Sequence, residues 1–364
     1  MKLAEIINTI EEFASLQWQE PYDNAGLLTG HSEMEINSAL ICLDCTEAVV
    51  EEAIKFNCNL IIAHHPIIFS GLKKINGKNY VERTLIKAIK NDIAIYAAHT
   101  NLDNIKHGVN KKIAEKIGLM NLEVLLPKKN ILRKLITFCP HSHAENVRTA
   151  LFAAGAGNIS NYDSCSFSVD GVGTFRGNQH TSPFAGKKGE LHREPETRIE
   201  VIFSQEIQSK VINALFLSHP YEEVAYDILQ LENVANSIGS GITGTLPQSV
   251  TETDFLNQIK KIFGCKTIRH TELLGKKIER VSVCGGAGSF LLKNAIISKS
   301  DIYISSDFKY HEFFDAEKKI VIADIGHYES EQFTGEIFYE LIKKKFTTFA
   351  IRFSEINTNP VNYF

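Results

Sequence analysis

Two adjacent histidines follow a short apolar run near the start of the chain. Residues 60–63 read Leu-Ile-Ile-Ala, which is typical of a strand buried on both faces of a parallel sheet. Pro66 keeps His65 extended, because proline disfavours the helical conformation of the preceding residue. Side chains alternate along an extended chain, so His64 and His65 can each give one imidazole to a different metal ion. This predicts a dinuclear site. The alternative is that the rings end the strand by hydrogen bonding to the backbone.

Two later apolar runs also end in groups that bind metals. Asp103 follows the run 93–98, and His327 and Glu331 follow the run 320–325. Four residues apart, His327 and Glu331 share one face if a helix begins near them. Because ligands gather beyond the carboxyl ends of parallel strands, we expect these side chains at one edge of one sheet. Considered without the other residues, Asp103 could be an ordinary turn residue, and Glu331 could be an acidic residue in the first turn of a helix.

These groups predict the number and the class of the metal ions. The expected ligands are His64, His65, Asp103, His327 and Glu331. Five nitrogen and oxygen ligands exceed what one catalytic zinc ion accepts, and they suit two ions bridged by a carboxylate, either Glu331 or Asp103. Without a thiolate, the set permits zinc, manganese, iron, cobalt or nickel, of which we favour zinc.

Other polar groups follow the same apolar runs. His99, Asp307 and His311 are candidates to orient a ligand or to move a proton, or else they are ordinary polar residues at strand ends. The turn at residues 284–289, Cys-Gly-Gly-Ala-Gly-Ser, enters a predicted helix. It is interpreted either as a phosphate-binding turn or as a tight structural turn.

The surrounding pattern alternates strands with helices. Apolar runs at 36–46, 58–66 and 93–103 predict strands, and periodic segments at 46–57 and 79–92 predict helices between them. The same alternation resumes from residue 253. We therefore expect a discontinuous α/β domain with a largely parallel sheet, formed by residues 1–127 and 240–364.

Residues 128–239 differ from the rest of the chain in the order of their predicted helices and strands. Their order is predicted as β-α-β-β-α-β, which is the ferredoxin-like split motif. We expect an inserted α+β domain that forms oligomer contacts, with a second boundary within the Gly-, Ser- and Asn-rich segment 232–249. His219, Glu222 and Glu223 in this domain are interpreted as structural or contact residues rather than as a catalytic cluster.

Composition limits the class of protein. The formal charge of −4 makes nonspecific nucleic-acid binding an unlikely role, and no apolar run is long enough to cross a membrane. The N-terminal segment has the spacing of an amphipathic helix rather than the apolar centre of a signal peptide. Seven scattered cysteines are typical of a reducing compartment, so a cytoplasmic location is expected.

Several strings together resemble a known family. AHHPIIF, HTNLD, SDFKYH and DIGHYESE, with PYDNAGLLTG before them, resemble the Nif-three-like (NGG-interacting factor) family, also labelled GTP cyclohydrolase I type 2 homologs. The resemblance covers the whole chain. It implies a dinuclear centre on residues 64, 65, 103, 327 and 331, and a toroidal homohexamer whose insertion resembles the PII/CutA type.

Three hypotheses for function follow. The first is a metal-dependent hydrolase of the GTP cyclohydrolase 1 type 2 homolog kind, in which activated water opens the guanine imidazole ring of GTP. The second keeps the metals but makes the substrate a phosphoester. The third is a metal-binding scaffold or regulatory ring protein without enzymatic activity.

Overall fold

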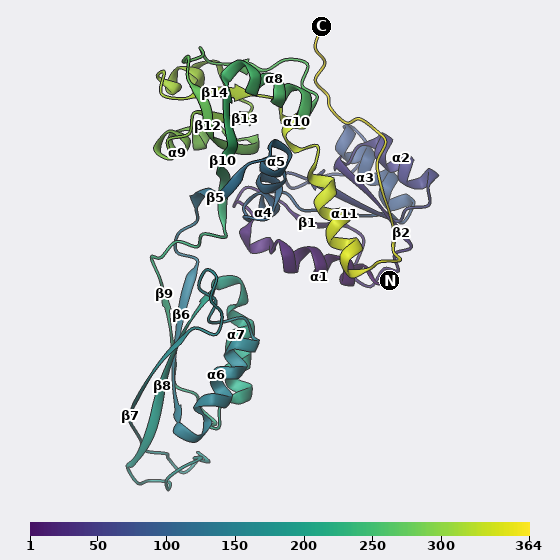
Figure 1. Ribbon diagram of the computed structural model, residues 1–364. Coiled ribbons are helices and arrows are strands. Elements are labelled where there is room, and N and C mark those ends of the chain that lie inside the picture. Colours follow the sequence, from purple (N-terminus) through teal and green to yellow (C-terminus); the bar gives the residue numbers. More distant parts are fainter. The chain divides into compact units, whose positions relative to one another are not determined.

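A computed structural model describes residues 1–364, and the chain divides into two compact units. One unit combines Met1–Pro127 with Ser237–Phe364, and the other is Lys128–Asn236. Figure 1 shows both units. No helix in either unit has the length and apolar character that a membrane span requires.

The first sheet of the larger unit contains the strand that ends in the histidine pair. Its order is β1-β4-β3-β2-β15, and only β1 runs antiparallel to its neighbour. The strands are β1 (Gly26–Thr29), β2 (Ser38–Asp44), β3 (Leu60–His65), β4 (Ala94–Ala97) and β15 (Ala350–Phe353).

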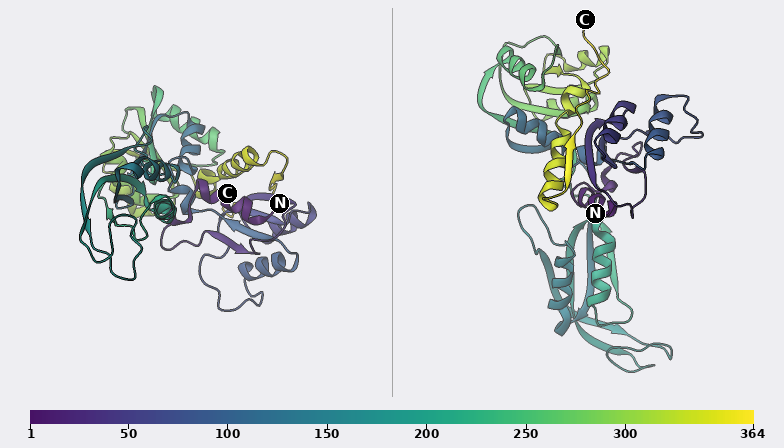
Figure 2. Two further views of the ribbon diagram at one scale, coloured as in Figure 1. Left: turned by 90° about the horizontal axis from the view of Figure 1, so that it is seen from below. Right: turned by 90° about the vertical axis from the view of Figure 1, so that its right-hand side faces the viewer.

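Helices cover both faces of this sheet because its strands are apolar on both sides. On one face, Leu40 and Ile61 pack with the buried sides of α2 and α3. On the other face α11 lies against β2 and β3 and beside α1, as Figures 1 and 2 show. The helices are α1 (Leu3–Phe13), α2 (Glu47–Lys55), α3 (Tyr80–Lys90), α4 (Thr100–Asp103) and α11 (Thr334–Lys345).

A second sheet of the same unit has the order β11-β14-β13-β12-β10-β5. Its central strands β12, β13 and β14 are parallel, and the others are antiparallel to their neighbours. The strands are β5 (Met120–Pro127), β10 (Gly239–Thr251), β11 (Arg269–His270), β12 (Lys277–Ala287), β13 (Ile302–Ser306) and β14 (Val321–Asp324). The helices are α5 (Val109–Ile117), α8 (Glu252–Phe263), α9 (Leu292–Ile297) and α10 (His327–Glu331).

The expectation of one sheet in this unit is therefore wrong. Strands β1 to β4 pair with β15 in one sheet, whereas β10 to β14 form a second sheet, whose outer strand β5 pairs with β10. Part of the Gly- and Ser-rich segment expected as a boundary is strand β10. Gly239 is required there, since a Cβ atom would lie 2.2 Å from the carbonyl oxygen of Leu126.

The smaller unit is a four-stranded sheet with two helices. Its strand order is β7-β8-β6-β9, and all neighbours are antiparallel. The helices α6 and α7 lie together on one face, as Figure 1 shows. The elements are β6 (Leu132–Pro140), α6 (Ala144–Ala153), β7 (Ser166–Phe175), β8 (His192–Ser204), α7 (Gln208–Ser218) and β9 (Tyr226–Gln230).

Candidate metal centre

The five expected ligands lie together in the larger unit, between elements of its two sheets. His64 and His65 end β3, and Asp103 ends α4 directly after β4. His327 and Glu331 come from α10, which follows β14 of the second sheet. Their ligand atoms form two overlapping groups, each within 4.8 Å: His64, Asp103 and Glu331, and then His65, His327 and Glu331. Such groups can hold a metal ion.

His64 is fully buried and its tautomer is fixed by the backbone. Its Nδ1 lies 2.8 Å from the carbonyl oxygen of Ala98, which only accepts hydrogen bonds, so Nδ1 carries the proton. Burial lowers the pKa of His64, so the ring is neutral and Nε2 presents a lone pair. That lone pair faces Asp103 Oδ1 at 3.6 Å and Glu331 Oε1 at 3.7 Å.

This arrangement places acceptors against acceptors. Both His64 Nε2 and Asp103 Oδ1 are buried and have no hydrogen-bond partner. Buried polar atoms are almost always partnered, so two orphaned acceptors that face each other indicate a missing cation. The residues present therefore fit a metal ion at this position.

His65 and His327 form the second group around Glu331. Their Nε2 atoms lie 2.9 Å and 3.0 Å from Glu331 Oε2, and 3.3 Å from each other. Ligand atoms that share one tetrahedral zinc ion lie roughly 3–3.5 Å apart, given bond lengths of about 2.0–2.2 Å. The spacing of this group therefore also fits a single ion.

Carboxylates hold the far sides of these two rings. His65 Nδ1 bonds to Asp44 Oδ1 at 2.7 Å, and His327 Nδ1 bonds to Asp307 Oδ2 at 2.6 Å. A carboxylate behind a metal-binding imidazole fixes its orientation and raises its basicity. Asp307 thus fixes the orientation of the His327 ring. Asp44 has the same role but was not singled out in the sequence, where it looks like the polar end of a strand.

The close contacts of this cluster shift the pKa values of its members. Burial lowers the pKa of His65, but hydrogen bonds to Asp44 and Glu331 outweigh it and raise the pKa to about 10. For His327, burial is outweighed by the charge of Glu331 and by Asp307, which raise the pKa to about 11. Burial opposes ionisation of Glu331, yet these histidines hold its pKa well below the usual value. Burial and the charge of Glu331 raise the pKa of Asp103.

A glycine on β12 makes room for the shared carboxylate. Gly286 has φ +60°, and a Cβ atom there would lie 2.4 Å from Glu331 Oε1. Its N–H donates to Ser330 Oγ, and the N–H of Gly285 donates to Asn110 Oδ1. These two N–H groups are therefore already bonded within the protein and are not available to a phosphate group.

His99 lies beside the cluster, whereas His311 does not join its hydrogen bonds. The ring of His99 is 5.3 Å from the rings of both His64 and His65. Its Nδ1 bonds to Asp23 Oδ1 at 2.8 Å. Burial would raise the pKa of Asp23, but the bonds from His99 and Thr100 lower it to about 2. His311 is exposed, and its ring contacts Tyr310 and Phe314.

Comparison with known proteins relates this fold and cluster to a family. The profile described as Duf34/NIF3 (NGG1p interacting factor 3) matches residues 1–360. The chain belongs to the DUF34/NIF3 family. A Halalkalibacterium halodurans protein is 39% identical over 372 residues, covering 100% of both chains. A Bacillus subtilis protein is 36% identical over 369 residues, covering 99% of this chain and 98% of the relative. Both relatives are described as "GTP cyclohydrolase 1 type 2 homolog".

Solved structures of DUF34/NIF3-like chains have the same fold. A Bacillus cereus protein related to NIF3 is 38% identical, with a TM-score of 0.87, and the match covers 100% of this chain and 99% of that one. A Staphylococcus aureus protein has a TM-score of 0.80 at 27% identity, with the same coverage. The match to each structure spans both compact units.

Proposed function

We propose that this DUF34/NIF3 chain is a hydrolase that depends on two divalent metal ions and opens the guanine imidazole ring of GTP. The observation that carries the proposal is the pair of ligand groups that share Glu331, together with the two orphaned acceptors, His64 Nε2 and Asp103 Oδ1, in one of these groups. The descriptions of its relatives as GTP cyclohydrolase 1 type 2 homologs favour GTP as the substrate. Zinc is the favoured metal, since imidazole and carboxylate ligands suit it, although the same ligands also permit manganese, iron, cobalt or nickel.

Each residue of the centre has a defined part in this proposal. His64 and Asp103 hold one ion, His65 and His327 hold the other, and Glu331 bridges them. Bound divalent ions would act as Lewis acids and lower the pKa of water toward about 7. His99, whose Nδ1 is held by Asp23, would use Nε2 to accept a proton from the water that adds to guanine C8 and to pass it to the ring nitrogen that leaves as the C8–N bond breaks. A second water, deprotonated in the same way, would then cleave the resulting formamide and release formate. Asp44 and Asp307 keep the two rings in place.

The proposal is tested by measuring both candidate products. Protein loaded with zinc, and the same protein after chelation, would be incubated separately with GTP and with a phosphodiester. Formate from GTP that disappears on chelation supports the proposed reaction. Chelator-sensitive hydrolysis of the diester without formate would instead identify a phosphoesterase. Two bound ions with no turnover of either substrate would identify a metal-binding scaffold.

Two variants test the ligand assignment. His64→Ala and His327→Ala should each reduce the metal content, because each removes a ligand from a different group. His180→Ala, which removes an exposed histidine of the smaller unit, is the matched control and should keep the full content. Full metal retention in both test variants would contradict the assignment.

We also propose that the smaller unit is a ferredoxin-like domain that joins copies of the chain into a homohexamer. Support comes from its antiparallel strand order β7-β8-β6-β9 and from the sheet face opposite α6 and α7. Ile199 and Val201 of β8 pack in the core with these helices. Phe167 and Val169 of β7 pair with the intervening residues of β8, so they lie on the other face, where they are 67% and 50% exposed.

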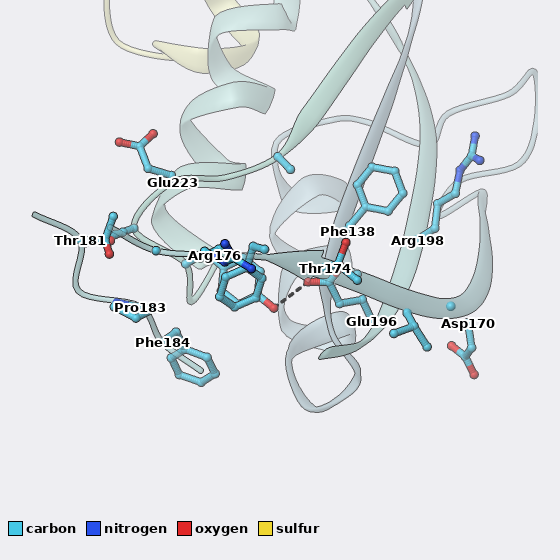
Figure 3. A pocket seen from close by; sticks show the side chains of 18 of the residues that line it. Phe138, Asp170, Thr174, Arg176, Thr181, Pro183, Phe184, Glu196, Arg198 and Glu223 are labelled. Carbon is cyan, nitrogen blue, oxygen red and sulfur yellow. Dashed lines mark hydrogen bonds between the residues drawn. The ribbon is translucent and has the colours of Figure 1, made fainter. Parts of the chain in front are cut away.

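A pocket of about 600 Å³ lies against β7 and β8 in this unit (Figure 3). Its walls include Val169, Phe184 and Glu196, and the carboxylate of Glu196 accepts a hydrogen bond from Tyr221. An apolar hollow on an uncovered sheet face is suited to side chains of another copy. We expect the native mass of a hexamer in solution. Val169→Asp should lower that mass, and a monomeric wild-type protein would contradict the proposal.

A further inference from the structure

Two aromatic rings lie exposed on the loops next to the candidate metal centre. Tyr22 is 64% exposed and Phe69 is 52% exposed. The two rings contact each other, with centroids 6.3 Å apart and planes tilted by 42°. Scattered apolar side chains need no explanation, but two adjacent exposed rings beside a chemical site indicate a binding surface.

The pair continues inward to the metal ligands through His99. The Phe69 ring lies 6.4 Å from the His99 ring, and His99 lies 5.3 Å from the rings of His64 and His65. The rings therefore form a row from the buried ligands to the surface. Phe69 meets His99 edge-on, with the ring planes 70° apart, so a flat molecule that stacks on an outer ring would point its inner edge toward His99 and the ligands.

Hydrogen bonds fix both loops that carry the rings. Asn24 Nδ2 donates to the carbonyl oxygen of Ile68 at 2.6 Å, which ties the two loops together. Asp23, directly after Tyr22, accepts the N–H of Thr100 at 3.0 Å and binds His99. Rings on anchored loops lose little freedom when a ligand stacks on them, so they contribute more to affinity than rings on mobile loops.

We propose that Tyr22 and Phe69 form the stacking surface for the planar base of a purine nucleotide whose reacting edge lies at the candidate metal centre. This inference rests on the proposed function and names residues that select its substrate. Stacking requires only a flat π-system, so these rings favour a nucleobase over an alkyl phosphoester.

Nearby charged groups fit the rest of a nucleotide. Lys73 and Lys74 are exposed on the same loop, four and five residues after Phe69, and offer positive charge to phosphate groups. Burial and the charges of Glu20, Asp23 and Asp103 raise the pKa of Tyr22. The Tyr22 hydroxyl therefore stays protonated and can donate a hydrogen bond to the base.

Binding of guanosine tests the proposal without any need for turnover. Calorimetry would compare guanosine with tripolyphosphate, using wild-type protein and the variants Tyr22→Ala and Phe69→Ala. We expect guanosine to bind roughly 5- to 150-fold more weakly to each variant, the range that loss of one base–aromatic stack gives. Tyr22→Phe and Phe69→Trp keep an aromatic face and should restore binding. Unchanged affinity in both alanine variants, or no guanosine binding by the wild type, would overturn the proposal.

Kinetics separate this proposal from the proposed function. If GTP is hydrolysed, Tyr22→Ala and Phe69→Ala should raise KM and leave kcat largely intact, because stacking holds substrate and transition state alike. Guanosine binding through the rings without formate release would refute the reaction but support the stacking surface. Formate release with an unchanged KM in both variants would refute the stacking surface alone.

Two controls complete the experiment. Tyr162→Ala removes a ring that is 75% exposed in the smaller unit, and it should leave guanosine affinity unchanged. The native mass of each variant would be measured as well. A lower mass for Tyr22→Ala or Phe69→Ala would show that the rings join copies of the chain, which would overturn a role in base binding.

Discussion

Each histidine of the candidate centre has one ring nitrogen bonded to a fixed partner, and in His64, His65 and His327 the other nitrogen faces a carboxylate of the cluster. The holding groups are the carbonyl oxygen of Ala98 and the carboxylates of Asp44, Asp307 and Asp23. These partners fix which nitrogen can bind a metal ion. Their loss should therefore weaken metal binding even where every ligand remains.

Asp307→Asn tests this at one ring. The amide can still contact His327 but carries no charge, so the ring becomes a weaker ligand. Loss of such a partner typically reduces metal affinity about 10- to 100-fold. We expect weaker binding of one of two ions, measured by metal content after dialysis against graded chelator. Asp315→Asn, an exposed carboxylate on the following segment, is the control. Equal affinities in both variants would contradict the role of Asp307.

Metal binding should also depend on pH. The pKa of His65 is raised to about 10 and that of His327 to about 11, so both rings are protonated at neutral pH without metal. An ion must displace these protons, because only neutral imidazole binds metal. Affinity should therefore rise from pH 6 to pH 9, by up to roughly tenfold per pH unit for each proton displaced. Calorimetry in buffers of different ionisation enthalpy measures proton release. Release of no protons at pH 7 would refute this prediction.

At the scale of elements, the shared carboxylate depends on the end of β12. Gly286→Ala would place a Cβ atom against Glu331 Oε1 and keep an unfavourable positive φ. Because Glu331 belongs to both ligand groups, we expect this variant to lose both ions rather than one. Metal content by elemental analysis gives the result.

Gly264→Ala is the matched control for this substitution. Gly264 ends α8 with φ +64°, and a Cβ atom there meets nothing within 4 Å. It carries a similar backbone strain, about 1 kcal/mol, without the clash. It should lower stability slightly and retain both ions. Full metal content in Gly286→Ala would contradict the assigned role of Glu331.

The sequence predicted which residues come together in the candidate site better than it predicted which strands share a sheet. His64, His65, Asp103, His327 and Glu331 were expected together and lie together, while their binding of metal stays a prediction. That prediction came from apolar runs that end in polar side chains. Sheet membership depends on which strands pair, and single-strand patterns contain little of that information. Strand β1 was not predicted, because its four residues lie beside turn-forming residues and resemble a loop. Strand β10 was not predicted, because its glycines, which allow close backbone packing, are typical of a loop in the sequence.

Asp44 and Asp23 were missed for a different reason. Neither is near the ligands along the chain, and a single aspartate at a strand end or in a turn is common. Only the folded chain shows that these carboxylates face His65 and His99. Partners that position a ligand are defined by contact, so spacing along the sequence does not predict them.

At the scale of the whole molecule, the two compact units should respond differently to metal. The ligands all belong to the larger unit, and they come from elements of both its sheets. An ion at 100 times its Kd stabilises the folded state by about 2.7 kcal/mol. We expect calorimetry to resolve a transition whose Tm falls on chelation and another that does not move. Equal shifts of all transitions, or no shift, would contradict this division.

The order of the ligands along the chain also constrains when the centre can be completed during synthesis. His64, His65 and Asp103 leave the ribosome early, whereas His327 and Glu331 appear only after the entire smaller unit has been translated. A nascent chain therefore carries an incomplete set of ligands for most of its elongation. If the cluster binds metal ions as proposed, loading of the complete ligand set must follow translation of the smaller unit.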